Sequence, residues 1–178
     1  MKKLEVSLDD DLYEFLEFLE RTRFIKSKES AVQKALLLFK KLSMHDWLPD
    51  TYRIGNNRVI IMDRGMLLDI FELLTEHDIY RAGQLTAMKR KVLRPEFRDI
   101  DLTKPTNWPI VLKELENLGW GLFSKVGNEI KIEHAAVPTG YLRGYLETMF
   151  NVELKEHRTK VEGLTVFIAE KSKLDTWR

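Results

Sequence analysis

The chain contains no cysteine, and only nine glycines and five prolines occur among its 178 residues. Without cysteine it has neither a disulfide framework nor thiolate ligands for zinc. No apolar run approaches the length of about 18 residues that a transmembrane helix needs. The amino terminus also lacks the charged and then apolar pattern of a secretory signal. The sequence therefore predicts a cytoplasmic protein that does not enter a membrane.

The sequence also lacks an excess of either charge, because 29 basic residues nearly balance 28 acidic ones. Overall charge therefore gives no general affinity for nucleic acid, and any contact with DNA has to come from a local basic surface. Enzyme motifs are missing as well, among them a glycine-rich phosphate loop, a zinc protease helix and a serine hydrolase elbow. The sequence predicts a binding protein and not an enzyme.

The first 43 residues show the most distinctive pattern. Residues 2–8 alternate between polar and apolar side chains, as in a strand with one covered face. Two amphipathic helical stretches follow, one starting near Asp9 and one near Ser27, and both residues are good helix caps. One strand and two short helices cannot close a core, and a lone strand leaves backbone groups unpaired. The simplest solution is pairing with the same strand of a second chain, in an intertwined homodimer.

This segment resembles the ribbon-helix-helix family of DNA-binding regulators. The resemblance is carried by Lys3-Leu4-Glu5-Val6-Ser7-Leu8, by Asp10-Asp11-Leu12 and by Ser27-Lys28-Glu29-Ser30-Ala31-Val32-Gln33-Lys34-Ala35-Leu36. It implies that a two-stranded ribbon enters the major groove of double-stranded operator DNA. It also implies that the N-terminus of the second helix holds a DNA phosphate. The residues expected at the DNA are Lys2, Lys3, Glu5, Ser7, Ser27 and Lys28.

Two features depart from the family pattern. Glu5 occupies the middle groove-facing position, where the family usually has a neutral or basic residue. A carboxylate there can accept a hydrogen bond from the cytosine amino group, but it also repels phosphate. The usual Ser-Glu order at the start of the second helix is reversed here, as Glu29-Ser30. These departures leave open the alternative that the N-terminal domain serves only as a dimerisation clamp.

Residues 44–57 interrupt both periodicities with turn residues, so the sequence predicts a linker there. Residues 58–178 then predict a second domain with the element order β-α-α-α-β-β-α-β-β, which is typical of an α+β domain with an antiparallel sheet. The predicted strands are 58–63, 121–126, 129–135, 152–160 and 164–170, and the predicted helices are 65–76, 78–91, 108–118 and 138–150. The predicted fold is therefore an N-terminal ribbon-helix-helix (β-α-α, intertwined dimer) followed by this α+β domain.

Several pieces of the second domain resemble the 4-vinyl reductase-like small-molecule-binding domain, over roughly residues 58–170. The resemblance is carried by residues 115–121, 138–146, 161–167 and 80–83. It implies a sensor for hydrophobic or aromatic small molecules, which a DNA-binding head would turn into a one-component regulator. Many members of that family carry cysteine ligands for zinc near the closing hairpin, and this chain has none.

A pocket for such an effector needs apolar and aromatic walls with few polar groups. The candidates for lining it are Phe71, Tyr80, Trp108, Trp120, Phe123, Tyr141 and Tyr145, although aromatic side chains also fill cores. Arg143 is a candidate for meeting an anionic ligand, while Gly140 and Gly144 permit close helix packing. His134 and His157, with Glu156, are an alternative set of metal ligands. No other cofactor is expected.

Together these patterns predict a homodimeric transcription regulator with a C-terminal domain that binds a small hydrophobic effector. Two alternatives stay open. The first is an antitoxin-like protein whose C-terminal part binds a protein partner. The second is a metabolite-binding or enzymatic C-terminal domain whose N-terminal head only dimerises.

Overall fold

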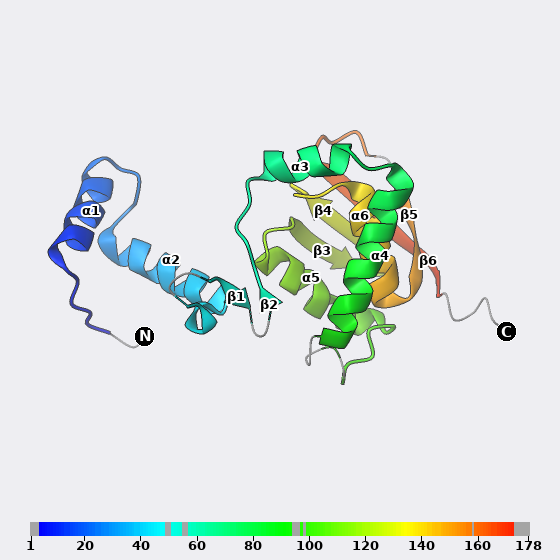
Figure 1. The fold of residues 1–178 in the computed structure, drawn as a ribbon, viewed down its shortest axis with the longest axis horizontal. Coiled ribbons are helices and arrows are strands. Elements are labelled where there is room, and N and C mark those ends of the chain that lie inside the picture. The colour runs from blue at the N-terminus through cyan, green and yellow to red at the C-terminus, as the bar shows by residue number, and fades with distance from the viewer. Residues whose placement is uncertain are drawn as a thin grey trace. The chain divides into compact units, whose positions relative to one another are not determined.

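The computed structural model of the chain describes residues 4–48, 51–54, 57–93, 97, 99–157 and 159–172. The chain divides into two compact units, residues 1–60 and 61–178, whose elements are labelled in Figure 1. Lys2 and Lys3 lie outside the described residues. Among the described helices, none combines the length and the apolar character needed to cross a membrane.

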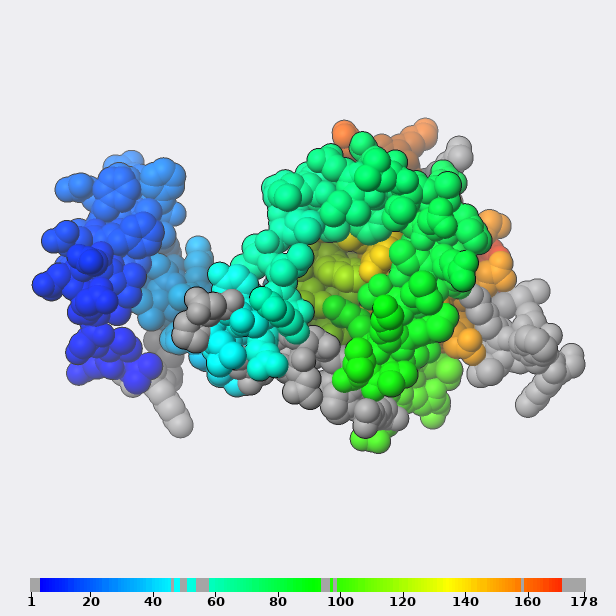
Figure 2. Space-filling model, viewed as in Figure 1, coloured from blue at the N-terminus to red at the C-terminus, as the bar shows by residue number. Residues whose placement is uncertain are grey.

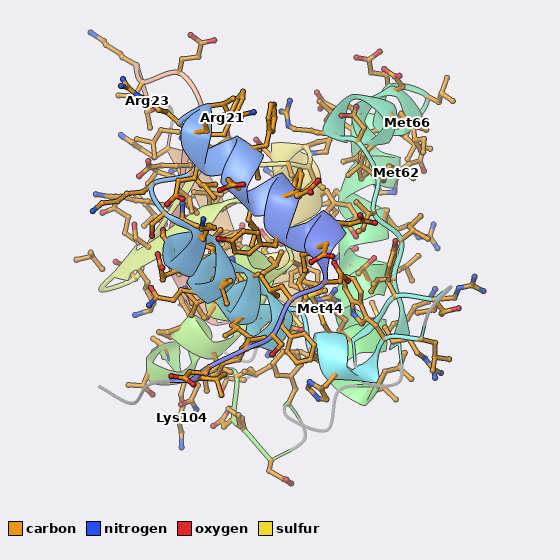
Figure 3. The ribbon with its side chains drawn as sticks, turned by 90° about the vertical axis from the view of Figure 1, so that its left-hand side faces the viewer. Arg21, Arg23, Met44, Met62, Met66 and Lys104 are labelled. Carbon is orange, nitrogen blue, oxygen red and sulfur yellow. The ribbon has the colours of Figure 1, made fainter. Side chains whose placement is uncertain are left out.

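The first unit starts with two helices that lie side by side, α1 (Asp10–Arg21) and α2 (Lys28–Lys41), as Figures 1 and 3 show. The Asp9 carboxylate caps α1 by accepting a hydrogen bond from the Leu12 N–H at 2.9 Å. The Ser27 hydroxyl caps α2 in the same way, accepting from the Ser30 N–H at 3.1 Å. The helix starts that the sequence predicts near Asp9 and Ser27 are therefore confirmed.

The predicted N-terminal strand is not formed within the single chain, where residues 4–9 carry no strand and the helices come first. The physical reason is that a strand requires hydrogen bonds to a neighbouring strand. No described segment of the chain pairs with these residues. Leu4 and Val6 are consequently 74% and 59% exposed.

The segment predicted as a linker contains regular structure. A 3-10 helix, η1 (Met44–Asp46), follows α2, and β1 (Arg53–Ile54) pairs antiparallel with β2 (Asn57–Arg58). The rings of Trp47 and Tyr52 pack with 4.5 Å between their centroids. β2 thus belongs to a local hairpin, and the strand predicted at 58–63 is not part of the sheet of the second unit.

The second unit is an α+β structure with a four-stranded antiparallel sheet in the order β3-β4-β6-β5 and helices over one face (Figure 1). The strands are β3 (Leu122–Val126), β4 (Glu129–Glu133), β5 (Val152–His157) and β6 (Leu164–Ser172). The helices are α3 (Arg64–Glu72), α4 (Glu76–Leu93), α5 (Trp108–Asn117) and α6 (Thr139–Phe150), with the 3-10 turn η3 (Pro105–Asn107) before α5. The predicted α+β class and antiparallel sheet are confirmed.

One face of the sheet forms the core of the second unit. Ile130 and Ile132 of β4 are fully buried, as are Phe167 of β6 and, nearly, Leu154 of β5. Because strand side chains alternate between faces, these residues share the helix-covered side. α6 is buried around most of its circumference, as a helix between the sheet and α4 must be.

Turn chemistry fixes the β3–β4 hairpin. Gly127 has a φ of +59°, the left-handed conformation that a type II′ turn demands at its first central position. The Asn128 side-chain amide donates to the Ala169 carbonyl at 2.9 Å, and the Asn128 carbonyl accepts from the Ala169 N–H at 3.0 Å. These two bonds tie the tip of the hairpin to β6.

The helices α4 and α6 cross with their backbones in contact, at Gly83 and Gly144. A Cβ atom added at Gly83 would lie closer than 3.0 Å to the carbonyl oxygen of Tyr141, and one at Gly144 would meet that of Tyr80 equally closely. The contact is reciprocal, so both positions require glycine. The predicted close packing at Gly144 is confirmed, whereas a Cβ at Gly140 would have an ordinary contact of 3.7 Å.

Replacing Gly83 or Gly144 by alanine should destabilise the second unit by about 2 kcal/mol or more, because the two backbones would have to move apart. Urea unfolding followed by circular dichroism measures the effect. Gly140→Ala is the matched control on the same helix, and it should leave the stability unchanged or slightly raised. Equal stability of Gly144→Ala and Gly140→Ala would contradict the crossing.

Candidate nucleic-acid interface and effector site

The N-terminus of α2, predicted to hold a DNA phosphate, already has acceptors of its own. The Lys28 N–H donates to the Glu20 carboxylate at 3.3 Å, while the Ser30 N–H is used by the Ser27 cap. The Lys28 side chain turns toward α1, where its Nζ lies 3.3 Å from the Tyr13 hydroxyl and 3.5 Å from Glu20. The hydrogen bond to Tyr13 is the main cause that raises the pKa of Lys28.

Glu29 adds a second carboxylate at the same helix end. Hydrogen bonds from its own backbone N–H and from the Ser27 hydroxyl lower the pKa of Glu29. Acidic groups at a helix N-terminus complement the helix dipole, so both carboxylates stabilise α2 as it stands. A phosphate arriving at Ser27 and Lys28 would have to displace Glu20.

Basic side chains gather at the turn between the two helices. Figure 3 shows Arg21 and Arg23 at the end of α1, where the chain turns toward α2. Arg23 has a φ of +62°, the left-handed region that costs a residue with a Cβ roughly 1 kcal/mol. Of the other residues predicted at the DNA, Glu5 and Ser7 lie exposed ahead of α1.

The two helices of the first unit leave much apolar surface uncovered. Leu16 is the one buried residue among those described in this unit. Large apolar side chains on α1 and α2 that are between 43% and 67% exposed are Leu12, Phe15, Phe18, Leu36, Leu37, Leu38 and Phe39. A unit with so little burial does not hold its own core.

The second unit brings together four of the seven side chains predicted to line an effector pocket. Tyr141 has its ring centroid 5.3 Å from that of Phe71 and 5.5 Å from that of Trp120. The Trp120 ring in turn lies 5.4 Å from the ring of Tyr145. We call Phe71, Trp120, Tyr141 and Tyr145 the aromatic cluster; they come from α3, from α6 and from the turn before β3.

Arg90 of α4 places a positive charge on the aromatic cluster. Its guanidinium carbon lies 5.4 Å from the ring centroid of Trp120 and 5.9 Å from that of Tyr145, within cation–π range. A salt bridge of 3.3 Å to Glu114 balances the charge. No sequence pattern pointed to Arg90 or Glu114, since single charges on amphipathic helices usually face solvent.

The hydroxyl groups of the aromatic cluster differ in their surroundings. The Tyr141 hydroxyl donates to the Thr86 hydroxyl at 2.9 Å. The Tyr145 hydroxyl is buried and has no hydrogen-bond partner within the described structure. Burial is the main cause that raises the pKa of both phenols, so both stay neutral near pH 7. The Tyr145 hydroxyl is therefore a buried polar group inside the core, with the Arg90 guanidinium as its charged neighbour.

Figure 2 shows a hollow in the surface of the second unit between α3 and α4. Its floor has the yellow-green and yellow colours of the β3–β4 hairpin and of α6. Phe71 and Tyr145 of the aromatic cluster belong to the core of the second unit, and Trp120 and Tyr141 pack against that core.

Tyr80 belongs to a separate polar network on the other side of the α4–α6 crossing. Its hydroxyl donates to the buried Glu147 carboxylate at 2.5 Å and accepts from the Gln84 side chain at 3.3 Å. Glu147 also accepts the Leu154 N–H of β5 at 3.0 Å. The Arg143 guanidinium lies over the Tyr80 ring, 5.3 Å from its centroid, rather than facing the cluster.

Trp108 and Phe123 lie apart from the aromatic cluster as well. Trp108 stacks on Phe150 at 4.6 Å and donates from its indole nitrogen to the Leu102 carbonyl at 3.1 Å, which makes it a core residue. Phe123 lines an apolar groove of about 510 Å³ between α5 and β3. The predicted set of seven is thus divided among a cluster, a polar network, the core and a groove.

The histidines do not form a metal centre in the part of the chain that the structure describes. No group of three histidine, cysteine, aspartate or glutamate residues there is placed to hold a metal ion. The alternative ligand set of His134, His157 and Glu156 is therefore not assembled. His134 instead lines an open groove of about 600 Å³ with Arg64 and Thr139.

Comparison with known proteins returns no match: no family model, no curated protein and no solved structure matches this chain significantly.

The Tyr80 network makes stability depend on pH at the alkaline end. Burial, and then the bond to Glu147, raises the pKa of Tyr80 from 10.0 to about 12. Because the folded state holds this proton more tightly, the stabilisation is complete below pH 10 and is lost as the pH rises through about 12. Urea unfolding at several alkaline pH values should show a shallower decline for Tyr80→Phe than for the wild type. Equal slopes would contradict the assignment.

Proposed function

We propose that the chain is a homodimeric, DNA-binding transcription regulator that does not itself catalyse a reaction. Its first unit would be a ribbon-helix-helix head, and its second unit a 4-vinyl reductase-like sensor for a small aromatic molecule. The observation that carries the proposal is the first unit, whose alternating segment has no partner strand and whose helices bury a single described residue.

A second copy of the head supplies what the single chain lacks. Antiparallel pairing of the two 4–8 segments would satisfy their backbone groups and turn Leu4, Val6 and Leu8 toward the helices. The exposed apolar side chains of α1 and α2 would then form a shared core, each contributing roughly 1.5–3 kcal/mol on full burial. The dimer explains why these side chains are apolar at all.

The opposite face of such a ribbon presents Lys3, Glu5 and Ser7 to the major groove. Side chains of these types can read base edges, with the lysine reaching guanine and the carboxylate accepting from cytosine. The arginines at the α1–α2 turn add positive charge close to the start of α2 (Figure 3). This local charge supports DNA binding by a protein whose net charge is only +1.

The aromatic cluster supports the sensor assignment. It combines several ring faces, a guanidinium and the buried Tyr145 hydroxyl. An effector regulates DNA binding only if its affinity differs between the DNA-competent and DNA-incompetent states. We expect a bound ligand to repack the aromatic cluster and to shift α3 or α4. That shift would make the ligand affinity differ between the two states.

One specific observation favours a head that only dimerises. The carboxylates of Glu20 and Glu29 stand at the N-terminus of α2, where the DNA-binding reading places a phosphate. A DNA complex requires the Glu20 contact to open, and the following experiments separate the two readings.

The regulator reading predicts that the wild-type chain is a dimer and binds its own promoter DNA more tightly than random DNA, with an affinity that falls steeply with salt. Phe15→Glu should dissociate the dimer and abolish DNA binding, because it places a charge in the shared core. Sedimentation velocity and fluorescence anisotropy measure the two properties. Leu73→Glu, at an apolar residue of the second unit that is 87% exposed, is the matched control.

A monomeric wild-type chain at micromolar concentration would overturn the proposal. A dimer that binds promoter and random DNA equally weakly would leave only the dimerisation role. Release of the promoter by an aromatic compound such as phenol, lost in Trp120→Ala, would support the sensor.

Glu20→Gln should tighten DNA binding by about two- to fivefold, which corresponds to the 0.3–1 kcal/mol of a charge at a helix terminus. The substitution keeps the acceptor for the Lys28 N–H but removes the negative charge that competes with phosphate. Anisotropy titrations at low salt measure the change. Glu17→Gln, at an exposed position of the same helix, should alter the affinity less; equal effects would place the phosphate elsewhere.

A further inference from the structure

Two arginines face each other across the β1–β2 hairpin. Arg53 pairs with Arg58 in the register of the two strands. The next pair outward is hydrogen bonded, since the Val59 N–H donates to the Tyr52 carbonyl at 2.9 Å. Antiparallel pairs alternate between hydrogen-bonded and non-hydrogen-bonded types, so Arg53 and Arg58 form a non-hydrogen-bonded pair. Side chains of such a pair lie on the same face and at the closest spacing that a sheet allows.

No acidic group within the described structure compensates this pair. Neither arginine forms a salt bridge or a side-chain hydrogen bond there. The Nε of Arg53 is buried without an acceptor. Like charges directly opposite each other destabilise a hairpin, and a buried charged donor without an acceptor costs still more. A bound anion would remove the repulsion between the two guanidinium groups.

We propose that Arg53 and Arg58 form an oxyanion site that takes a phosphate group. A guanidinium keeps its charge at every accessible pH and presents a planar fork of donors that matches phosphate oxygens. A phosphate group has enough acceptor oxygens to serve two guanidinium forks at once. A single carboxylate has only two oxygens and one charge to set against the two guanidinium groups.

The source of this phosphate is the DNA backbone, a step that rests on the proposed function. The hairpin belongs to the same compact unit as α1 and α2, and η1 contacts both α2 and β1. A phosphate bound at the hairpin would therefore extend the DNA contact of the head beyond the ribbon. Free inorganic phosphate has the same chemistry, so it is the second source to be tested.

The first experiment tests the oxyanion site without DNA. The melting temperature of the full-length protein is measured in inorganic phosphate and in chloride at equal ionic strength. Phosphate should raise it for the wild type by mass action, and the rise should be lost in Arg53→Gln and in Arg58→Gln. Arg81→Gln, at an exposed arginine of α4, is the matched control and should keep the wild-type response. Arg58 is itself exposed, so its substitution leaves the packing intact.

The second experiment tests whether the phosphate bound at this site comes from the DNA backbone. Promoter affinity is measured over a salt series for the same variants. Loss of one phosphate contact should lower the slope of log affinity against log salt by about 0.9, with weaker binding at low salt. Such a loss in Arg53→Gln and Arg58→Gln, but not in Arg81→Gln, supports a DNA phosphate.

The outcomes separate this inference from the proposed function. If the wild type does not bind DNA but phosphate stabilises it through Arg53 and Arg58, the regulator reading fails and the oxyanion site stands with a free phosphate as its ligand. If the wild type binds DNA with a salt slope that both variants retain, and phosphate and chloride act alike, the oxyanion site is refuted and the regulator reading stands.

Discussion

The second unit depends on the backbone contact between α4 and α6 at Gly83 and Gly144. Each glycine faces a carbonyl oxygen of the other helix, so the two axes approach more closely than side chains would permit. That approach fixes which residues meet on either side of the crossing. On one side Tyr80 reaches the buried Glu147, and on the other Tyr141 reaches Thr86. The polar network and the position of Tyr141 in the aromatic cluster both depend on this contact.

The partly buried charged side chains of the second unit also depend on contacts between different helices and strands. Arg90 is positioned over two aromatic rings and balanced by Glu114, while Glu147 joins α6 to both Tyr80 of α4 and the Leu154 N–H of β5. Partly buried charges of this sort stabilise a fold only when their partners are correctly placed. The buried Tyr145 hydroxyl lies in the same region, since the guanidinium carbon of Arg90 is 5.9 Å from the Tyr145 ring centroid.

The first unit, in contrast, buries very little of its apolar surface. Its two capped helices are locally well formed, yet they bury almost nothing against each other, and the alternating segment before them pairs with no described strand. In the proposed homodimer, a second copy of the chain would supply the missing strand partner and cover the exposed apolar side chains. The two arginines of the β1–β2 hairpin lack acidic partners in the described structure, just as the apolar side chains of the two helices lack a covering surface.

The sequence by itself determined several elements: the helix starts near Asp9 and Ser27, and an α+β second unit with an antiparallel sheet. These follow from periodicity and local hydrogen bonding, which neighbouring residues decide. Only the tertiary structure decided that Trp108 fills the core, that β2 joins a local hairpin, and that Arg90 lies on the aromatic cluster. Those outcomes depend on contacts between residues that are distant in the chain. The position of a single arginine or tryptophan within a helix does not indicate which distant residue it contacts.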